Sequence, residues 1–183
     1  MKSEFILEQL NIIYEKKFYE YIKFGNNKNI NIEFVSANPT GPIHIAHIRG
    51  AIFGDVLSSL YNKMGFKVTR EYYVNDAGSQ IEKLANSLYK RYLELFNKKI
   101  EILDDEYPGE YLIDIAKEIF LKDKDKWLNT NHNEYYSYFK TIAVNKLLNQ
   151  IKKDLKLIDV KFDIFTHETS IVERKIINKL FKI

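Results

Sequence analysis

His44 and His47 are the side chains of this sequence best placed to bind an anion. They stand three positions apart at the start of a run in which apolar residues recur with helical spacing, so both would lie on one face of the first helical turn. That turn has unpaired N–H groups and carries the positive end of the helix dipole, which suits a phosphate. The pair alone is a weak signal, because most histidines lie on surfaces or in hydrogen-bonded cores. A metal site is the alternative, but no cysteine or carboxylate stands nearby at ligand spacing.

A strand and a rigid turn precede the two histidines. Residues 30–35 predict a short strand. Pro39 and Pro42 each fix a backbone angle, and Gly41 permits angles that other residues resist. We therefore expect a tight turn that leads from this strand into a helix beginning near His44.

A second strand is predicted at residues 66–74, which are rich in aromatic and β-branched side chains. The intervening helix should end near Met64, with Gly65 as its left-handed cap. Strand, helix and strand form a βαβ unit, so the two strands should be adjacent and parallel. Such sheets bind ligands at the carboxyl ends of their strands. Both the proline-rich turn and the stretch 75–78 lie at such ends, which makes this edge the expected site.

The rest of the chain is predicted to be mostly helical, and only the two strands above are convincing as parallel strands. The aromatic residues at 135–139 fit either base stacking or, more commonly, a packed helical face. His132 and His167 have no evident chemical partners in the sequence, and we interpret both as structural. The expected helices are 3–24, 79–96, 110–122 and 133–157, and the expected short strand is 160–166. Ser79 with Glu82, and Ser170 with Glu173, have the spacing of a capping box at the start of a helix.

Composition narrows the class of protein. The chain has 183 residues, of which 45% are hydrophobic and 29% charged, with a net charge of +3 and no cysteine. Disulfides, thiolate metal sites and cysteine nucleophiles are therefore excluded. The small positive charge allows nucleic-acid contact without arguing for it. No apolar stretch is long enough to cross a membrane, the N-terminus is not a signal peptide, and the acidic run 104–106 is expected to be a solvated loop.

Two longer runs carry a resemblance to a known family. His44-Ile45-Ala46-His47 resembles the HIGH signature of class I aminoacyl-tRNA synthetases. The wider runs NIEFVSANPTGP (31–42) and VTREYYVNDAGSQI (68–81) resemble successive blocks of the arginyl-tRNA synthetases. There are two departures: Ala46 stands where the signature normally has glycine, and the second signature, Lys-Met-Ser-Lys-Ser, does not occur. The family chain is also much longer than this one.

The resemblance implies a fold, a division of the chain and a reaction. The fold would be α/β, the first half of a Rossmann-type parallel-sheet nucleotide-binding domain with a mostly helical insertion. Residues 1–28 would be a remnant of the N-terminal additional domain, 29–96 the catalytic half-domain, and 97–183 the truncated connective insertion. The reaction would be ATP-dependent activation of L-arginine, with Mg²⁺, and transfer of the arginyl group to tRNA(Arg). The full-length protein would be a cytoplasmic monomer with no membrane partner.

The resemblance also implies roles for particular residues. His44 and His47 would be catalytic, donating hydrogen bonds to ATP phosphates. The carboxylate of Glu33 would suit the cationic groups of arginine, and the amide of Asn38 offers both a donor and an acceptor. Without the resemblance, Glu33 is better interpreted as an exposed strand-edge residue and Asp76 as a residue that holds its own turn. No metal ligand is expected. The implied ATP-binding set is Thr40, Gly41, Pro42, His44, Ala46 and His47, and the implied arginine-binding set is Glu33, Ser36, Asn38 and Gln80.

Ala46 bears on ATP binding, because a methyl group there would crowd the adenine at a cost of about 1–3 kcal/mol. We expect this chain alone not to charge tRNA, because the lysine-bearing second signature is missing. Two alternatives stay open: a small self-contained nucleotidyltransferase with the same phosphate site, and a non-catalytic RNA- or protein-binding module derived from a synthetase. The first would need a complete five-stranded sheet.

Overall fold

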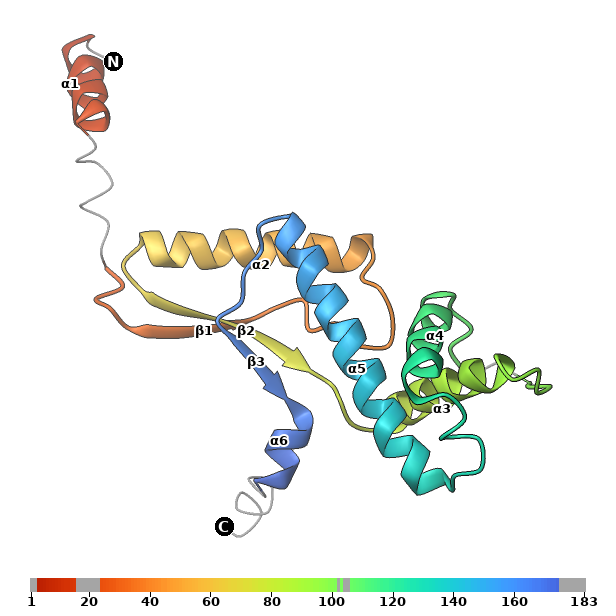
Figure 1. Cartoon of the computed structure of the whole chain (residues 1–183). Helices are drawn as coiled ribbons and strands as arrows, with labels where there is room; N and C mark the ends of the chain where they lie inside the picture. The colour runs from red at the N-terminus through yellow and green to blue at the C-terminus, as the bar shows by residue number, and fades with distance from the viewer. Residues whose placement is uncertain (1–2, 16–23, 102, 104–105, 175–183) are drawn as a thin grey trace.

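The computed structural model describes residues 3–15, 24–101, 103 and 106–174. It is a small parallel sheet with two helices across one face and a helical layer beyond its carboxyl edge, while α1 stands apart (Figure 1). The mixed α/β class expected from the sequence is confirmed. The elements are α1 (Ser3–Tyr14), β1 (Asn29–Glu33), α2 (Ile45–Lys63), β2 (Lys67–Val74), α3 (Ser79–Glu94), α4 (Tyr111–Asp123), α5 (His132–Leu157), β3 (Ile164–His167) and α6 (Glu168–Glu173).

The sheet has the order β1-β2-β3, and both pairs are parallel. Asn29 of β1 is opposite Lys67 of β2, and Glu71 of β2 is opposite Ile164 of β3. The predicted parallel pairing of the first two strands is confirmed. The expectation of only two parallel strands was wrong, because β3 adds a third. The sequence predicts a strand there, but its four residues carry no local signal for the distant strand with which they pair.

Helices α2 and α5 cover the same face of the sheet. Tyr72 and Val74 of β2 are fully buried there against Ala51 of α2 and Ile151 of α5. The opposite face carries polar side chains, because alternate residues of a strand point to opposite faces. Across it Glu71 accepts hydrogen bonds from Asn31 and Thr166. One face of this sheet is thus a packed core and the other a polar surface.

A second core joins α3, α4 and the N-terminal half of α5. Phe139 is fully buried in it, and Tyr135 stacks on Tyr89 with ring centroids 3.8 Å apart. The aromatic cluster at 135–139 is therefore a packed helical face, which was the more common of its two interpretations. Because α5 contributes to both cores, it ties the helical layer to the sheet.

Several predicted boundaries need correction. β1 ends at Glu33 and not at Val35, because Val35 and Ser36 have φ angles of 65° and 40°, which a strand cannot continue. The expected start of α2 is confirmed, with His44 as its N-cap. Of the helix predicted at 3–24, the residues from Ser3 to Tyr14 are helical and Phe24 is in a turn. Residues 16–23 lie outside the described residues.

The two predicted capping boxes are absent. Gly78, with a φ of 83°, is the N-cap of α3, and no side chain caps that helix. Only a glycine adopts this angle without strain, so the chain turns one residue earlier than Ser79 suggests. At the last helix the N-cap is His167, whose carbonyl accepts a hydrogen bond from Ser170 Oγ. The strand predicted at 160–166 begins only at Ile164.

Candidate functional site

The proline-rich turn is held from both sides. Within it, the Thr40 N–H donates to the Asn38 carbonyl at 2.7 Å, and Pro39 is fully buried. From α4, Tyr111 Oη donates to the Thr40 carbonyl at 2.6 Å. A methyl group added to Gly41 would lie 3.3 Å from that hydroxyl, which leaves little room for any side chain. The turn is thus fixed where it meets the first turn of α2.

A cavity of about 480 Å³ opens beside this turn. Its walls come from four places: the turn itself, the start of α2, the start of α3, and the segment that leads into α4. The lining residues are Ala37, Asn38, Thr40, Gly41, Pro42, His44, His47, Gln80, Tyr107 and Tyr111. Five of the six residues implied for ATP and two of the four implied for arginine therefore lie around one cavity.

The rings of the two histidines lie against each other at a tilt of 34°, with ring centroids 3.9 Å apart. The backbone N–H of His44 donates to Nδ1 of His47 at 3.2 Å, so a neutral His47 ring carries its proton on Nε2. Partial burial and the nearby His44 lower the pKa of His47 below its usual 6.5. His47 is therefore neutral near pH 7 and presents Nε2 as a hydrogen-bond donor.

The residues implied for arginine fall into two groups. Asn38 Nδ2 donates to Gln80 Oε1 at 2.8 Å, so these two amides face each other across the cavity wall. Glu33 and Ser36 do not line the cavity; Ser36 Oγ donates to Glu33 at 2.7 Å and accepts from the Tyr73 N–H at 3.0 Å. This second group lies where β1 ends, beside the polar face of the sheet.

Ala46 is exposed in the first turn of α2 and is absent from the cavity lining. Among the described residues, Ala46 therefore forms no part of a cavity wall against which adenine could lie. The crowding of adenine by its methyl group stays a prediction.

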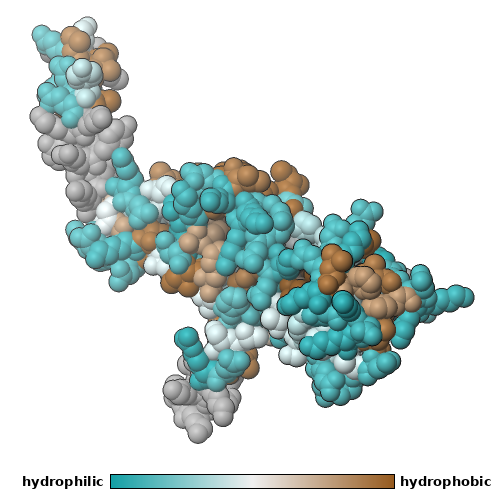
Figure 2. All heavy atoms as spheres, in the orientation of Figure 1, coloured by the Kyte–Doolittle hydropathy of each residue, from teal (hydrophilic) through white to brown (hydrophobic). Residues whose placement is uncertain are grey.

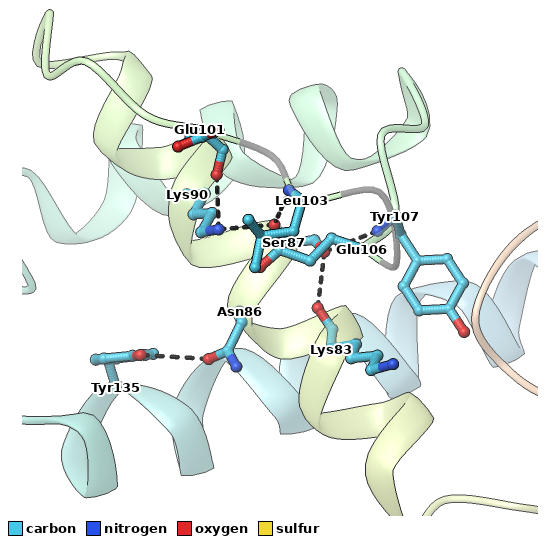
Figure 3. A network of polar contacts seen from close by, with 9 residues as sticks. All are labelled: Lys83, Asn86, Ser87, Lys90, Glu101, Leu103, Glu106, Tyr107 and Tyr135. Atoms are coloured by element: carbon cyan, nitrogen blue, oxygen red, sulfur yellow. Dashed lines mark hydrogen bonds and ion pairs between the residues drawn. The ribbon is translucent and has the colours of Figure 1, made fainter.

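Sequence reasoning missed Ala37, Tyr107 and Tyr111 in this cavity. Tyr107 is placed by a network on α3 (Figure 3): its N–H donates to the buried Ser87 Oγ at 3.0 Å. Next to it, Lys90 Nζ is 2.7 Å from a carboxylate oxygen of Glu106, whose side chain is only 7% exposed. The expected solvated loop is thus wrong at Glu106, which anchors the segment. The signal in the sequence is two tyrosines flanking Pro-Gly, but nothing local shows that they reach this cavity.

Asp76 does not hold its own turn; it joins β2 to the start of α6. It accepts from the Thr169 N–H at 3.0 Å, from Thr169 Oγ1 at 2.9 Å, and lies 2.7 Å from His167 Nδ1. Burial raises the pKa of Asp76, but the hydrogen bonds from Thr169 and His167 outweigh it and leave the pKa below 3.8. The expectation that His167 has no partner was wrong, because these residues are far apart in sequence.

His132 also has partners, since its ring stacks on that of Tyr136 with centroids 5.5 Å apart. Among residues 3–15, 24–101, 103 and 106–174, no three His, Cys, Asp or Glu side chains are grouped to hold a metal ion. No helix of that same part of the chain is long and apolar enough to cross a membrane.

Comparison with known proteins gives a consistent result. Residues 9–183 match the family described as tRNA synthetases class I (R), catalytic domain. The arginine–tRNA ligase of Rickettsia bellii (strain OSU 85-389) is 47% identical over 169 residues, which are 92% of this chain and 29% of that protein. The arginine–tRNA ligase of Orientia tsutsugamushi (strain Boryong) is 48% identical over 162 residues, 88% of this chain and 28% of that protein. The chain thus spans less than a third of the length of these relatives.

Solved structures agree. A putative arginyl-tRNA synthetase from Campylobacter jejuni superposes with a TM-score of 0.71 at 36% identity, covering 88% of this chain and 36% of that chain. The Thermus thermophilus arginyl-tRNA synthetase superposes with a TM-score of 0.55 at 19% identity, covering 85% of this chain and 26% of that one, which shows a shared fold.

Proposed function

The chain belongs to the class I tRNA synthetase (R) catalytic-domain family, and from that premise we propose that it forms the ATP- and arginine-binding half of an arginine–tRNA ligase. The reaction has two steps. The arginine carboxylate attacks the α-phosphate of ATP and pyrophosphate leaves; the arginyl group then passes to the 3′-terminal adenosine of tRNA(Arg). A self-contained nucleotidyltransferase does not fit this family membership.

The observation that carries the proposal is the shared cavity. His44 and His47 line it together with Asn38 and Gln80, at the carboxyl edge of a parallel sheet. Phosphoryl transfer needs positioning and charge stabilisation more than covalent help from the protein. A neutral His47 with a fixed Nε2 donor supplies this without reorganising as charge develops on the phosphate.

The arginine side chain would lie toward Glu33, while Asn38 and Gln80 would hold its amino and carboxylate groups. Mg²⁺ would enter with ATP; the ten residues that line the cavity include no carboxylate, so phosphates and water would supply its ligands. We keep the division into 1–28, 29–96 and 97–183 as part of this proposal, and we propose that the complete protein is a cytoplasmic monomer. The third strand, β3, lies in the last of these segments and completes the sheet edge.

The test is a titration of the isotope-labelled chain with ATP and, separately, with adenosine, followed by NMR. ATP should shift the resonances of the turn and of the first turn of α2. The variant His47→Ala should bind ATP about 10–100-fold more weakly, because a hydrogen bond to a charged group contributes about 1.5–3 kcal/mol. Adenosine, which has no phosphate, should bind both proteins alike.

The matched control is His132→Ala, which removes a histidine that stacks on Tyr136 on α5 and does not line the cavity. It should leave ATP affinity unchanged. Equal losses in the two variants, or ATP shifts confined to another surface, would contradict the proposed phosphate site and favour the non-catalytic binding module.

A further inference from the structure

A second and larger hollow, of about 630 Å³, lies between α4 and the C-terminal half of α5. Four of its ten lining residues are lysines, and two more carry side-chain amides. We call it the lysine groove. Its lining residues are Tyr111, Ile115, Glu118, Lys146, Leu147, Asn149, Gln150, Lys152, Lys153 and Lys156.

Three of the four lysines form a basic track along α5, with Asn149 and Gln150 between them. Positions 146, 149, 150, 153 and 156 recur at helical spacing and so share one face. The track runs for about 15 Å, at a rise of about 1.5 Å per residue. This part of α5 belongs to the hydrophilic surface facing the viewer in Figure 2. The groove therefore presents a line of charge and not a single point.

Part of this charge is uncompensated. Lys146 forms an ion pair with Glu118, the one acidic residue of the groove, and Lys152 lies over the Phe165 ring at 4.0 Å. Lys153 and Lys156 are exposed and form no ion pair within the described part of the chain. The groove thus keeps two cations available for an anionic partner.

The groove is continuous with the candidate site. Tyr111 lines both hollows, and its hydroxyl donates to the Thr40 carbonyl of the proline-rich turn. An anionic chain lying along α5 would therefore reach the cavity at Tyr111, whose ring offers a surface for stacking a base.

We infer that the lysine groove binds the phosphate backbone of single-stranded RNA whose 3′ end enters the cavity at Tyr111. This rests on the proposed function, which requires an RNA 3′ end at that cavity. Lysines in a row, amides and one aromatic ring are the combination that single-strand binding uses. An acidic protein partner fits less well, because the groove's apolar residues Ile115 and Leu147 are only 8% and 4% exposed and offer no anchoring pocket.

The test measures binding of a short 5′-fluorescein-labelled single-stranded RNA to the whole chain by anisotropy, across a salt series. The variant carries Lys153→Gln and Lys156→Gln. Each lost contact to a single-stranded phosphate lowers the slope of log K against log salt by about 0.7, so the pair should lower it by about 1.4. The matched control carries Lys98→Gln and Lys122→Gln, which remove the same charge at exposed positions outside the groove, and should leave the slope unchanged.

Equal slopes in the two double variants, or no RNA binding by the wild-type chain, would overturn the inference. Competition by polyglutamate as strong as by unlabelled RNA would also overturn it, and would indicate an acidic protein partner. The double variant at Lys153 and Lys156 should keep wild-type ATP affinity. A lowered salt slope in that double variant together with no ATP binding by the wild-type chain would instead count against the proposed function, so the two failures are distinguishable.

Discussion

At the scale of single residues, the site is built from donors whose orientation is fixed before any ligand arrives. The backbone of His44 sets the tautomer of His47, and Tyr111 fixes the carbonyl of Thr40. A donor held in place stabilises developing charge without paying for reorganisation at the moment of reaction. Partial burial of His47, and to a smaller extent the nearby His44, also lower the pKa of His47 and so disfavour its protonation.

The two groups implied for arginine can be separated from the phosphate site by kinetics. In a chain completed by the remaining part of a relative's catalytic domain, Glu33→Ala and Asn38→Ala should raise the KM for arginine far more than the KM for ATP. Glu33 lies at the end of β1 and Asn38 faces Gln80, so neither holds the histidines. Steady-state pyrophosphate exchange measures both constants, and equal effects on the two substrates would mean that these residues support the fold instead.

At the scale of elements, α2 approaches the sheet through small residues. Ala51, Gly54 and Ser58 are its buried residues, and a methyl group added to Gly54 would come within 2.2 Å of the Phe34 ring. This close approach packs the middle of α2 against Phe34, which directly follows β1, and so positions the helix that carries both histidines near its start. The packing of α2 against Phe34 thus depends on glycine, which has no side chain, at position 54.

Two glycines of α2 give a matched comparison. Gly54→Ala should lower the free energy of unfolding by about 1–3 kcal/mol through overpacking against Phe34. Gly50→Ala has nothing within 4 Å of the added methyl group and should raise it by up to about 1 kcal/mol, because alanine favours a helix more than glycine. Urea unfolding measures both, and a Gly54→Ala variant as stable as Gly50→Ala would contradict this packing.

Asp76 ties the third strand and α6 to β2, and its removal should show a defined pH dependence. Asp76→Ala leaves the Thr169 N–H and the His167 ring without their acceptor, at a cost of about 1–3 kcal/mol. Because the folded-state pKa of Asp76 is lowered, its contribution is fully present above 3.8 and is lost as the pH falls through the lower folded value. The gap in stability between wild type and variant should therefore narrow in acid.

The control for this experiment is Asp159→Asn, which removes an exposed carboxylate paired with Lys161 and keeps a residue type that tolerates the φ of 56° at this position. Thermal melts across acid pH should show little change in that variant. A constant gap between wild type and Asp76→Ala at all pH values would show that the loss comes from packing and not from the charge of Asp76.

Local patterns predicted the elements well and the long-range contacts poorly. The parallel β1–β2 pair and the start of α2 followed from the alternation of residues, the two prolines and Gly65. The third strand, the Asp76–His167 pair and the contact of Tyr111 with Thr40 join residues about 70 to 93 positions apart, and no local pattern encodes such pairs. The caps of α3 and α6 were missed because Gly78 and the chain geometry at His167 decide them, and not the Ser-Glu spacings.

At the scale of the whole molecule, α2 leaves much of its apolar surface uncovered. Ile45 is 82% and Phe53 70% exposed, and hydrophobic atoms are visible along this helix in Figure 2. The other side of the sheet is polar, and one edge strand, β1, has no neighbour beyond it within the described residues. Its relatives are more than three times longer, and under the proposed function this chain would supply the histidine half of the charge-stabilising machinery, since Lys-Met-Ser-Lys-Ser does not occur in its 183 residues.

The most direct test replaces the matching segment of the Rickettsia bellii arginine–tRNA ligase with residues 9–183 of this chain and measures arginine-dependent ATP–pyrophosphate exchange in the presence of tRNA(Arg). The chimera should exchange, His47→Ala within it should lower the rate by about 10²–10³, and this chain alone should stay at background. A folded chimera without exchange, a His47→Ala chimera with the full rate, or exchange by the isolated chain would contradict the account.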